Sequence, residues 1–250
     1  MKRRVGLTVE QMLERLVALE DDILYQEYAS EGDPEFLYVE GKLPILISAP
    51  HGAAHTRNGR YKGEDEYTAA FAQLIAEETG AHCIYARRKS KIDPNVAKDA
   101  PYKEKVREIA KEKNIRFVID LHGMWQHHEA GIELGTRDGR SCPAQKELIV
   151  HSLKESGFTL ENDDKFLRLR VDDKFSGNGS LTREPIVKFV SERLKIPAAQ
   201  FEINAANRIV ERRDDAAERD KSYRGNPEMI EKTVNAFIAL VNVIDQSLKE

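Results

Sequence analysis

Two histidines, each at the end of an apolar run and each followed by glycine, have the residue types and spacing that chemistry requires. Residues 43–50 lead into His51, and residues 117–121 lead into His122. Such runs predict strands, and in an open α/β sheet ligands bind at the carboxyl ends of strands. Imidazole is the commonest protein metal ligand, and glycine lets the backbone turn while leaving room for a metal or substrate. Two such strand ends in one chain therefore predict a metal site.

A carboxylate ligand is expected between the two histidines. A zinc hydrolase uses three protein ligands, typically two histidines and one carboxylate, and leaves a fourth position for water. Glu64, Asp65 and Glu66 stand at the start of a predicted helix, after the loop that begins with His51. Acidic residues are also common at helix N-termini for electrostatic reasons, so the cluster leaves open which of its members binds metal.

Two further carboxylates fit supporting roles. Asp120 precedes His122 by two residues, on the same face of a strand, where it either orients the imidazole or only caps local backbone. Glu202 lies in a predicted strand over 198–204, between two apolar residues. An apolar setting raises the pKa of a carboxyl, which suits a general base acting on a metal-bound water. The alternative for Glu202 is an ordinary exposed strand residue.

Other segments are assigned no metal. His55 stands in a loop-like sequence, and His127 and His128 are adjacent, an arrangement that seldom places both on one metal, so we expect none of the three to be a ligand. The segment 176–180 lacks the Gly-Lys-Ser/Thr ending of a phosphate-binding loop. We expect it to be a mobile loop over the cleft, because Arg183 follows it.

Composition sets wide limits. With 250 residues, 33% charged and 40% hydrophobic, the chain is expected to be globular, and its net charge of −4 gives no reason to expect nucleic acid as a partner. No stretch is long enough to span a membrane, and no signal-like segment is evident. Cys83 and Cys142 are expected as free thiols in a cytoplasmic protein. The sequence does not determine the oligomeric state.

Helical and strand patterns alternate along the chain and predict a single α/β domain over residues 1–250. A helix opening at the capping-box residue Thr8 and a β-hairpin of 36–39 with 43–50 form its N-terminal extension. Further strands are expected over 82–86, 117–121, 131–135 and 198–204, and further helices over 66–78, 102–113, 143–155, 185–194 and from Asn226 onward.

The order of these motifs resembles the N-formylglutamate amidohydrolase family, over about residues 43–207. The matching residues are Pro50-His51-Gly52, the acidic residue after the loop, the segment 119–123 and the segment 201–204. This family belongs with the zinc carboxypeptidase-like hydrolases. The resemblance implies a three-layer α/β/α fold with a mixed, mainly parallel central sheet, and one zinc ion per chain.

Carried over by position, the resemblance implies that His51 and His122 are zinc ligands and that Glu202 is the catalytic glutamate. Asp65 is the implied carboxylate ligand, because the family's acidic ligand stands shortly before a threonine, as Asp65 stands before Thr68. Its two acidic neighbours remain substitutes for it.

One position departs from the family pattern. The family often has arginine directly after an Asp-x-Asn motif, where it binds a substrate carboxylate; here Asp93 and Asn95 are present, but Val96 stands in place of the arginine. Asn95 is still expected to contact substrate, and Arg88 is expected to stabilise the oxyanion or hold the substrate. The cations that could bind a substrate carboxylate instead are Arg57, Arg88 and Arg183.

The implied activity is zinc-dependent hydrolysis of the amide bond of an N-acyl amino acid or small peptide. Two alternatives stay open. One is a catalytically inactive zinc-binding or ligand-binding module of the same fold. The other is a metal-dependent phosphohydrolase or esterase, for which more carboxylates and two metal ions are expected.

Overall fold

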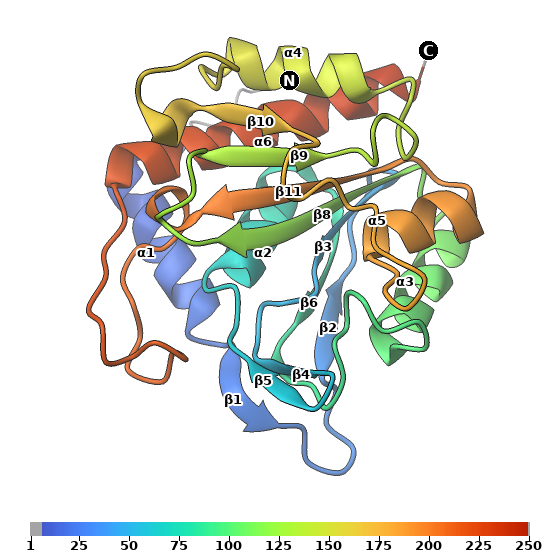
Figure 1. Ribbon diagram of the computed structural model, residues 1–250, viewed down its shortest axis with the longest axis vertical. Coiled ribbons are helices and arrows are strands. Elements are labelled where there is room, and N and C mark those ends of the chain that lie inside the picture. Colours follow the sequence, from blue (N-terminus) through green and yellow to red (C-terminus); the bar gives the residue numbers. More distant parts are fainter. Residues whose placement is uncertain (1–6, 250) are drawn as a thin grey trace.

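A seven-stranded mixed sheet forms the centre of the computed structural model, which describes residues 7–249 (Figure 1). The strand order is β10-β9-β11-β8-β3-β6-β2. Strands β11, β8, β3 and β6 are parallel, whereas β9 is antiparallel to β11 and β2 is antiparallel to β6. The strands are β2 (Phe36–Val39), β3 (Ile45–Ala49), β6 (His82–Ala86), β8 (Phe117–Met124), β9 (Ile132–Gly135), β10 (Leu169–Val171) and β11 (Ala198–Asn204).

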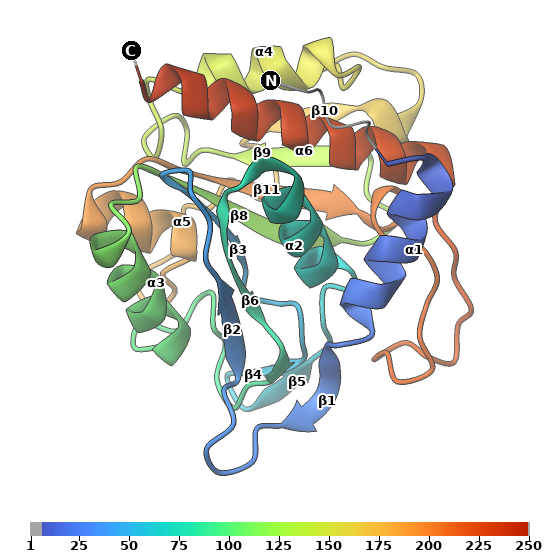
Figure 2. The same ribbon diagram turned by 180° about the vertical axis from the view of Figure 1, so that it is seen from behind.

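Helices cover both faces of the sheet and complete three layers (Figures 1 and 2). The elements α1 (Val9–Glu20), α2 (Thr68–Thr79) and α6 (Pro227–Ser247) cover one face, and α4 (Lys146–Glu155) packs against α6. The other face carries α3 (Pro101–Glu112) and α5 (Ile186–Phe189), which continues as a π-helical turn over Val190–Leu194. The α/β fold with a mixed, mainly parallel sheet, expected from the sequence, is confirmed.

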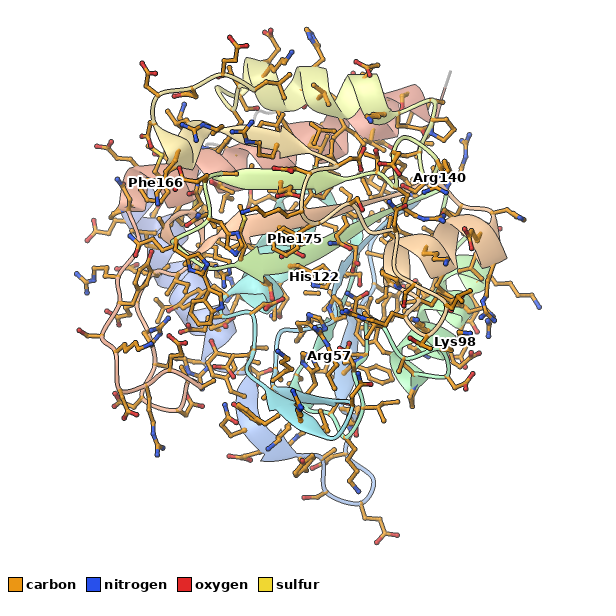
Figure 3. The ribbon with its side chains drawn as sticks, in the orientation of Figure 1. Arg57, Lys98, His122, Arg140, Phe166 and Phe175 are labelled. Carbon is orange, nitrogen blue, oxygen red and sulfur yellow. The ribbon has the colours of Figure 1, made fainter. Side chains whose placement is uncertain are left out.

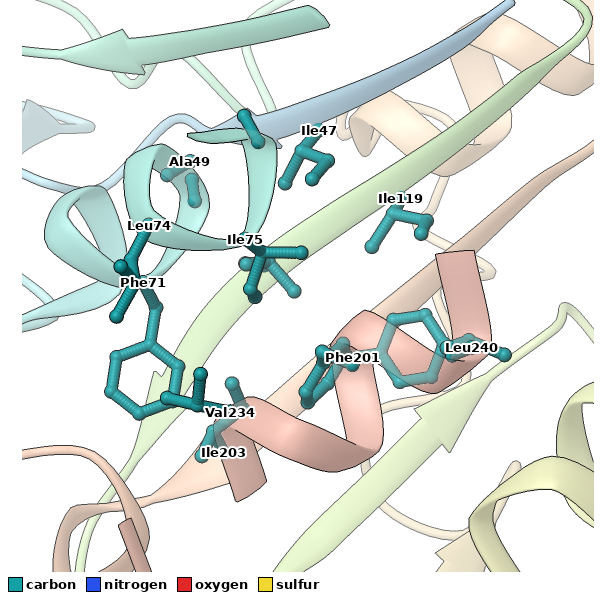
Figure 4. Close-up of a cluster of buried hydrophobic side chains, with 14 of the residues drawn as sticks. Ile47, Ala49, Phe71, Leu74, Ile75, Ile119, Phe201, Ile203, Val234 and Leu240 are labelled. Atoms are coloured by element: carbon teal, nitrogen blue, oxygen red, sulfur yellow. The ribbon is translucent and has the colours of Figure 1, made fainter. Parts of the chain in front are cut away.

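The buried strands send alternate side chains to two separate cores. Ile47, Ile119 and Phe201 face α2 and α6 (Figure 4), whereas Leu46 and Val118 face α3 and α5. Strands buried on both faces have nearly continuous apolar sequences, which is why they could be recognised as short apolar runs. Successive side chains of a strand point to opposite faces of the sheet. The same alternation therefore decides which face the polar residues near the strand ends reach.

The local signals for helix ends are confirmed. Thr8 forms a capping box with Gln11, Asn226 caps α6 with Pro227 at its first position, and Gly80 ends α2 in the left-handed region at φ 85°. These are short-range effects of side-chain hydrogen bonding and backbone freedom, so they depend little on the rest of the fold.

The predicted N-terminal hairpin is wrong. Strand β6 lies between β2 and β3, pairing antiparallel with β2 and parallel with β3. The connection through α2 places β6 beside β3, and β2 adds to the outer edge. A Cβ on Gly41, between β2 and β3, would lie 2.3 Å from the carbonyl of Ala81, so the chain crosses close to the start of β6 rather than turning tightly.

Two small ribbons lie beside the main sheet and were not predicted from the sequence. Strand β1 (Leu24–Tyr28) pairs with β7 (Arg88–Lys89), and β4 (His55–Arg57) pairs with β5 (Arg60–Lys62). No helix within residues 7–249 is long and apolar enough to cross a membrane. Both cysteines are buried and free. The organisation as one domain stays a prediction.

Candidate metal centre

The two strand-end histidines meet one carboxylate. His51 follows β3, His122 lies near the end of β8, and Asp65 lies in the loop before α2. The Nδ1 atom of His51 is 3.2 Å from Asp65 Oδ2 and 3.1 Å from the Nδ1 atom of His122, which is 3.4 Å from the same Asp65 oxygen. A tetrahedral ion with bonds of about 2.0–2.1 Å separates its ligand atoms by about 3.3 Å. The three donor atoms therefore fit a zinc ion.

The loop before α2 directs Asp65, and not its neighbours, to the histidines. The backbone N–H of Asp65 donates to the carbonyl of His51 at 2.8 Å, and its own carbonyl accepts from the hydroxyl of Thr68 at 2.7 Å. Glu64 instead accepts from the backbone N–H of Ala217, and Glu66 forms an ion pair with Arg212. The turn thus resolves an ambiguity that the acidic cluster left open.

Two buried carboxylates orient the histidine rings. His51 Nε2 lies 3.1 Å from Asp93 Oδ1, and His122 Nε2 lies 3.1 Å from Asp120 Oδ2. Each carboxylate accepts the Nε2 proton, so the Nδ1 lone pair of each ring faces Asp65, the tautomer that a metal ligand needs. With both Nδ1 lone pairs directed at the Asp65 carboxylate oxygen, three electron-rich atoms lie 3.1–3.4 Å apart and repel one another unless a cation lies between them. The donor set therefore favours a cation.

Asp93 is the member of this cluster that sequence reasoning missed. It lies in the loop after β7, and it also stands 3.3 Å from Nε2 of His55, whose ring stacks on that of His51. The Asp-x-Asn motif that contains Asp93 is a sequence signal for this residue, but by itself it does not indicate contact with His51. Such long-range partners leave no periodic pattern in the sequence.

His51, His55 and Asp93 form a second group of possible metal ligands, but its carboxylate is already occupied. Arg57 donates Nε–H to Asp93, and the backbone N–H groups of two following residues donate at 2.9 and 3.1 Å. A cation there would compete with a guanidinium. This group therefore fits the support of His51 better than a metal ion, and the group with Asp65 is the better candidate for the metal.

Glu202 stands beside His122 because β11 and β8 pair with these two residues in register. Its neighbours Phe201 and Ile203 point into the core, so Glu202 points to the opposite face, where it is 8% exposed. Gln200 donates to Glu202 Oε1 at 3.1 Å. Burial raises the pKa of Glu202 to about 7, although the nearby His122 acts against this shift. The carboxyl has the setting expected of a general base.

These groups open into one cavity of about 530 Å³. Figure 3 shows His122 with two other residues that line it, Arg57 and Phe175. The segment 174–180 forms part of the wall, as expected of the loop over 176–180, and Arg183 lines the cavity as well. The floor consists of His51, Asp65, His122 and Glu202.

The residues expected to contact substrate are only partly brought together. Arg57 and Asn95 line the cavity, but Arg57 is paired with Asp93, and the side chain of Asn95 contacts His122 at 3.3 Å and accepts from the backbone of Ile186. Arg88 does not line the cavity; it lies on β7, 3.5 Å from both Glu27 and Asp33, because the unpredicted β1–β7 ribbon turns it toward them.

The glycine after each histidine has a different use from the one expected. Neither Gly52 nor Gly123 has a positive φ. A Cβ on Gly52 would lie 2.7 Å from the Ala86 carbonyl oxygen and from the Ala69 side chain. Close packing of backbone, rather than a sharp turn, therefore requires glycine at position 52.

Replacing Asp120 with asparagine is expected to weaken metal binding about 10- to 100-fold, because His122 would lose the anion that fixes its tautomer. Titration calorimetry with zinc would measure the affinity. Asp245→Asn, at a buried position of α6, is the matched control and should bind zinc like the wild type. Equal affinities in the two variants would contradict the orienting role.

Comparison with known proteins supports the architecture. No protein-family model and no curated protein matches the sequence. The solved structure of N-formylglutamate amidohydrolase from Ralstonia eutropha JMP134 superposes with a TM-score of 0.61 at 15% identity, over 86% of this chain and 98% of that chain. A carboxypeptidase A candidate of Shewanella denitrificans OS-217 superposes with a TM-score of 0.51 at 12% identity, over 96% of this chain and 69% of that chain. The chain therefore shares the fold of these two structures.

A third similar structure belongs to the gene product Atu2144 of Agrobacterium tumefaciens, with a TM-score of 0.52 and 13% identity over 89% of this chain and 96% of that chain. The resemblance inferred from the order of the sequence motifs is thus confirmed at the level of the fold. At sequence identities of 12–15%, these matches show the backbone fold alone. The chemistry depends on the side chains of this chain.

Proposed function

We propose that this protein is a metal-dependent amidohydrolase that cleaves the amide bond of an N-acyl amino acid or small peptide. One observation carries the proposal: three donor atoms, 3.1–3.4 Å apart, share a cavity with the buried carboxyl of Glu202. His51, Asp65 and His122 would hold one zinc ion. This ligand set is the two-histidine, one-carboxylate type found in zinc hydrolases.

The chemistry that a zinc ion held by these three ligands would supply is Lewis-acid chemistry: a lower pKa for a bound water molecule and polarisation of a substrate carbonyl. Glu202 accepts a proton from the attacking water and returns it to the leaving nitrogen. Gln200 keeps one oxygen of Glu202 in place through its hydrogen bond. Asp93 and Asp120 accept hydrogen bonds from the Nε2–H groups of His51 and His122. The two rings therefore retain these protons and do not compete with Glu202 as acids in the cavity.

On the substrate side, we propose Arg57 and Arg183 as the cations that face a substrate carboxylate in place of the residue replaced by Val96. Arg183 is exposed and lines the cavity, and Val96 is buried in the same wall. Asn95 would contact substrate through its Nδ2 group, because its Oδ1 accepts a hydrogen bond from the backbone of Ile186.

The proposed base predicts a rising pH profile. Burial raises the pKa of Glu202 from 4.5 to about 7, and only the ionised carboxylate accepts a proton. The kcat/KM of the zinc-loaded enzyme should therefore rise about tenfold per pH unit below that pKa and level off above it. Because a bound cation favours the carboxylate, the midpoint should lie at or below about 7. A rate that falls from about pH 5 to pH 8 would contradict this role of Glu202.

Metal analysis and a substrate screen test the proposal as a whole. One zinc per chain together with hydrolysis of N-acyl amino acids, γ-glutamyl peptides or cell-wall peptides would support it. One zinc per chain without amide hydrolysis would indicate a binding module, and two metal ions with phosphoester hydrolysis would indicate a phosphohydrolase. A cytoplasmic location is part of the proposal and is tested by fractionating cells.

A further inference from the structure

Arg208 is a buried arginine placed at the ends of the two strands that carry His122 and Glu202. It follows the short 3₁₀ turn after β11 and is 4% exposed. Within residues 7–249, no acidic side chain forms an ion pair with it, and its Nε atom is buried without a partner. Burying a guanidinium costs free energy of folding unless it is paired or well hydrogen-bonded. A functional role would explain why Arg208 is kept at this position.

The guanidinium bridges the two strand ends. Nη1 of Arg208 lies 3.3 Å from the carbonyl oxygen of Met124, the last residue of β8, and 3.3 Å from that of Ile203 in β11. In the parallel ladder, Met124 lies two residues after His122, and Ile203 lies one residue after its partner Glu202. One cation therefore holds the two backbones together one to two residues beyond the pair.

The absence of a side chain at Gly123 makes this bridge possible. A Cβ on Gly123 would lie 2.4–2.6 Å from Nη2, Cζ and Nε of Arg208, so the guanidinium occupies the space of the missing side chain. By strand alternation Gly123 faces away from the side of the sheet that His122 faces. Gly123 also lines the cavity, so Arg208 lies directly behind the cavity floor.

We propose that Arg208 is a positioning residue for the hydrolysis proposed above, on which this inference rests: it ties the ends of β8 and β11 and so keeps Glu202 aligned with the metal ligand His122. The tie acts at the carboxyl-terminal end of the β8–β11 ladder, whose last pair is Asn204 with Met124. Misplacing a catalytic group by about 1 Å can cost about 100-fold in rate, so a small loss of alignment is measurable.

The test compares Arg208→Met and Arg208→Lys with Arg137→Met. Arg137 is equally buried, at 4% exposed, but binds Ser191 and Glu192 instead of the strand ends. Arg208→Met should lower kcat about 10- to 100-fold while KM changes less than about threefold, because the cavity walls stay in place. Arg208→Lys should recover part of the loss through one carbonyl, and Arg137→Met should keep the wild-type kcat.

Folding is checked by urea unfolding of each zinc-loaded variant, and Gly123→Ala offers an independent route, since it displaces the guanidinium without removing it. It should show the same loss of kcat at unchanged KM. A wild-type kcat in folded Arg208→Met would overturn the inference, as would an equal loss in Arg137→Met.

Cobalt binding separates this inference from the proposed function. If the wild type hydrolyses no amide, the proposed function fails, and Co²⁺ affinity and the visible spectrum of the Co²⁺-loaded protein decide the role of Arg208. Arg208→Met should then bind Co²⁺ about tenfold more weakly or show shifted bands, because His122 moves with its strand. Co²⁺ binding and a spectrum identical to those of the wild type and Arg137→Met would overturn the tie.

Discussion

The Glu202→Gln variant is expected to bind one zinc per chain and to lose amide hydrolysis by about 10²- to 10⁴-fold, the usual contribution of a general acid–base. Glutamine keeps the size of Glu202 and its hydrogen bond from Gln200, but it cannot accept a proton. Because Glu202 is absent from the group of metal-facing donor atoms, zinc binding should persist. Elemental analysis and kcat measured on the same sample test both parts.

Glu133→Gln is the matched control for Glu202. Glu133 pairs with Glu202 across β9 and β11, is 3% exposed, and its pKa is also raised by burial, but it does not line the cavity. Its carboxylate accepts from the backbone of Phe175, which a glutamine oxygen can also do. The control should therefore keep its activity. Zinc loss in folded Glu202→Gln would instead identify Glu202 as a ligand or a structural group.

The Asp65→Ala variant is expected to lose zinc affinity by more than about 100-fold, the upper range for removing an outer-shell partner, and to lose activity with it. Within residues 7–249, Asp65 supplies the only carboxylate oxygen that lies within 3.4 Å of the Nδ1 atoms of both His51 and His122. Removing it leaves two neutral ligands for a divalent ion. Zinc content after dialysis against a chelator measures the effect.

Two controls separate the alternatives that share His51. Glu64→Ala removes the neighbouring carboxylate and should keep one zinc per chain, because Glu64 accepts from Ala217 instead. His55→Ala removes a member of the second cluster and should also keep its zinc. If His55→Ala loses the metal while Asp65→Ala retains it, the ion belongs between His51, His55 and Asp93.

Local pattern was sufficient for much of the scaffold. The apolar runs that end before His51 and near His122 became β3 and β8, and Thr8 and Asn226 capped the helices expected of them. Strand burial and helix capping act over a few residues, so they leave a readable signal. The strand-end position of both histidines followed from that signal, and with it the expectation of a metal site.

The neighbours of these histidines depend on how distant segments meet. Only the turn before α2 distinguishes Asp65 from Glu64 and Glu66, and only the loop after β7 brings Asp93 to His51. The order of the strands at this edge of the sheet also depends on distant segments, because β6 separates β2 from β3, which the sequence predicts as a hairpin.

The contact partners of charged side chains were the hardest feature to predict from the sequence. Arg88 is turned toward Glu27 and Asp33 by a ribbon with no recognisable pattern, while Arg208 reaches the strand ends over the bare backbone of Gly123. A long side chain can reach partners on several elements, and its choice depends on which carbonyls and carboxylates the completed fold leaves within hydrogen-bonding distance. That information exists only once the chain has packed.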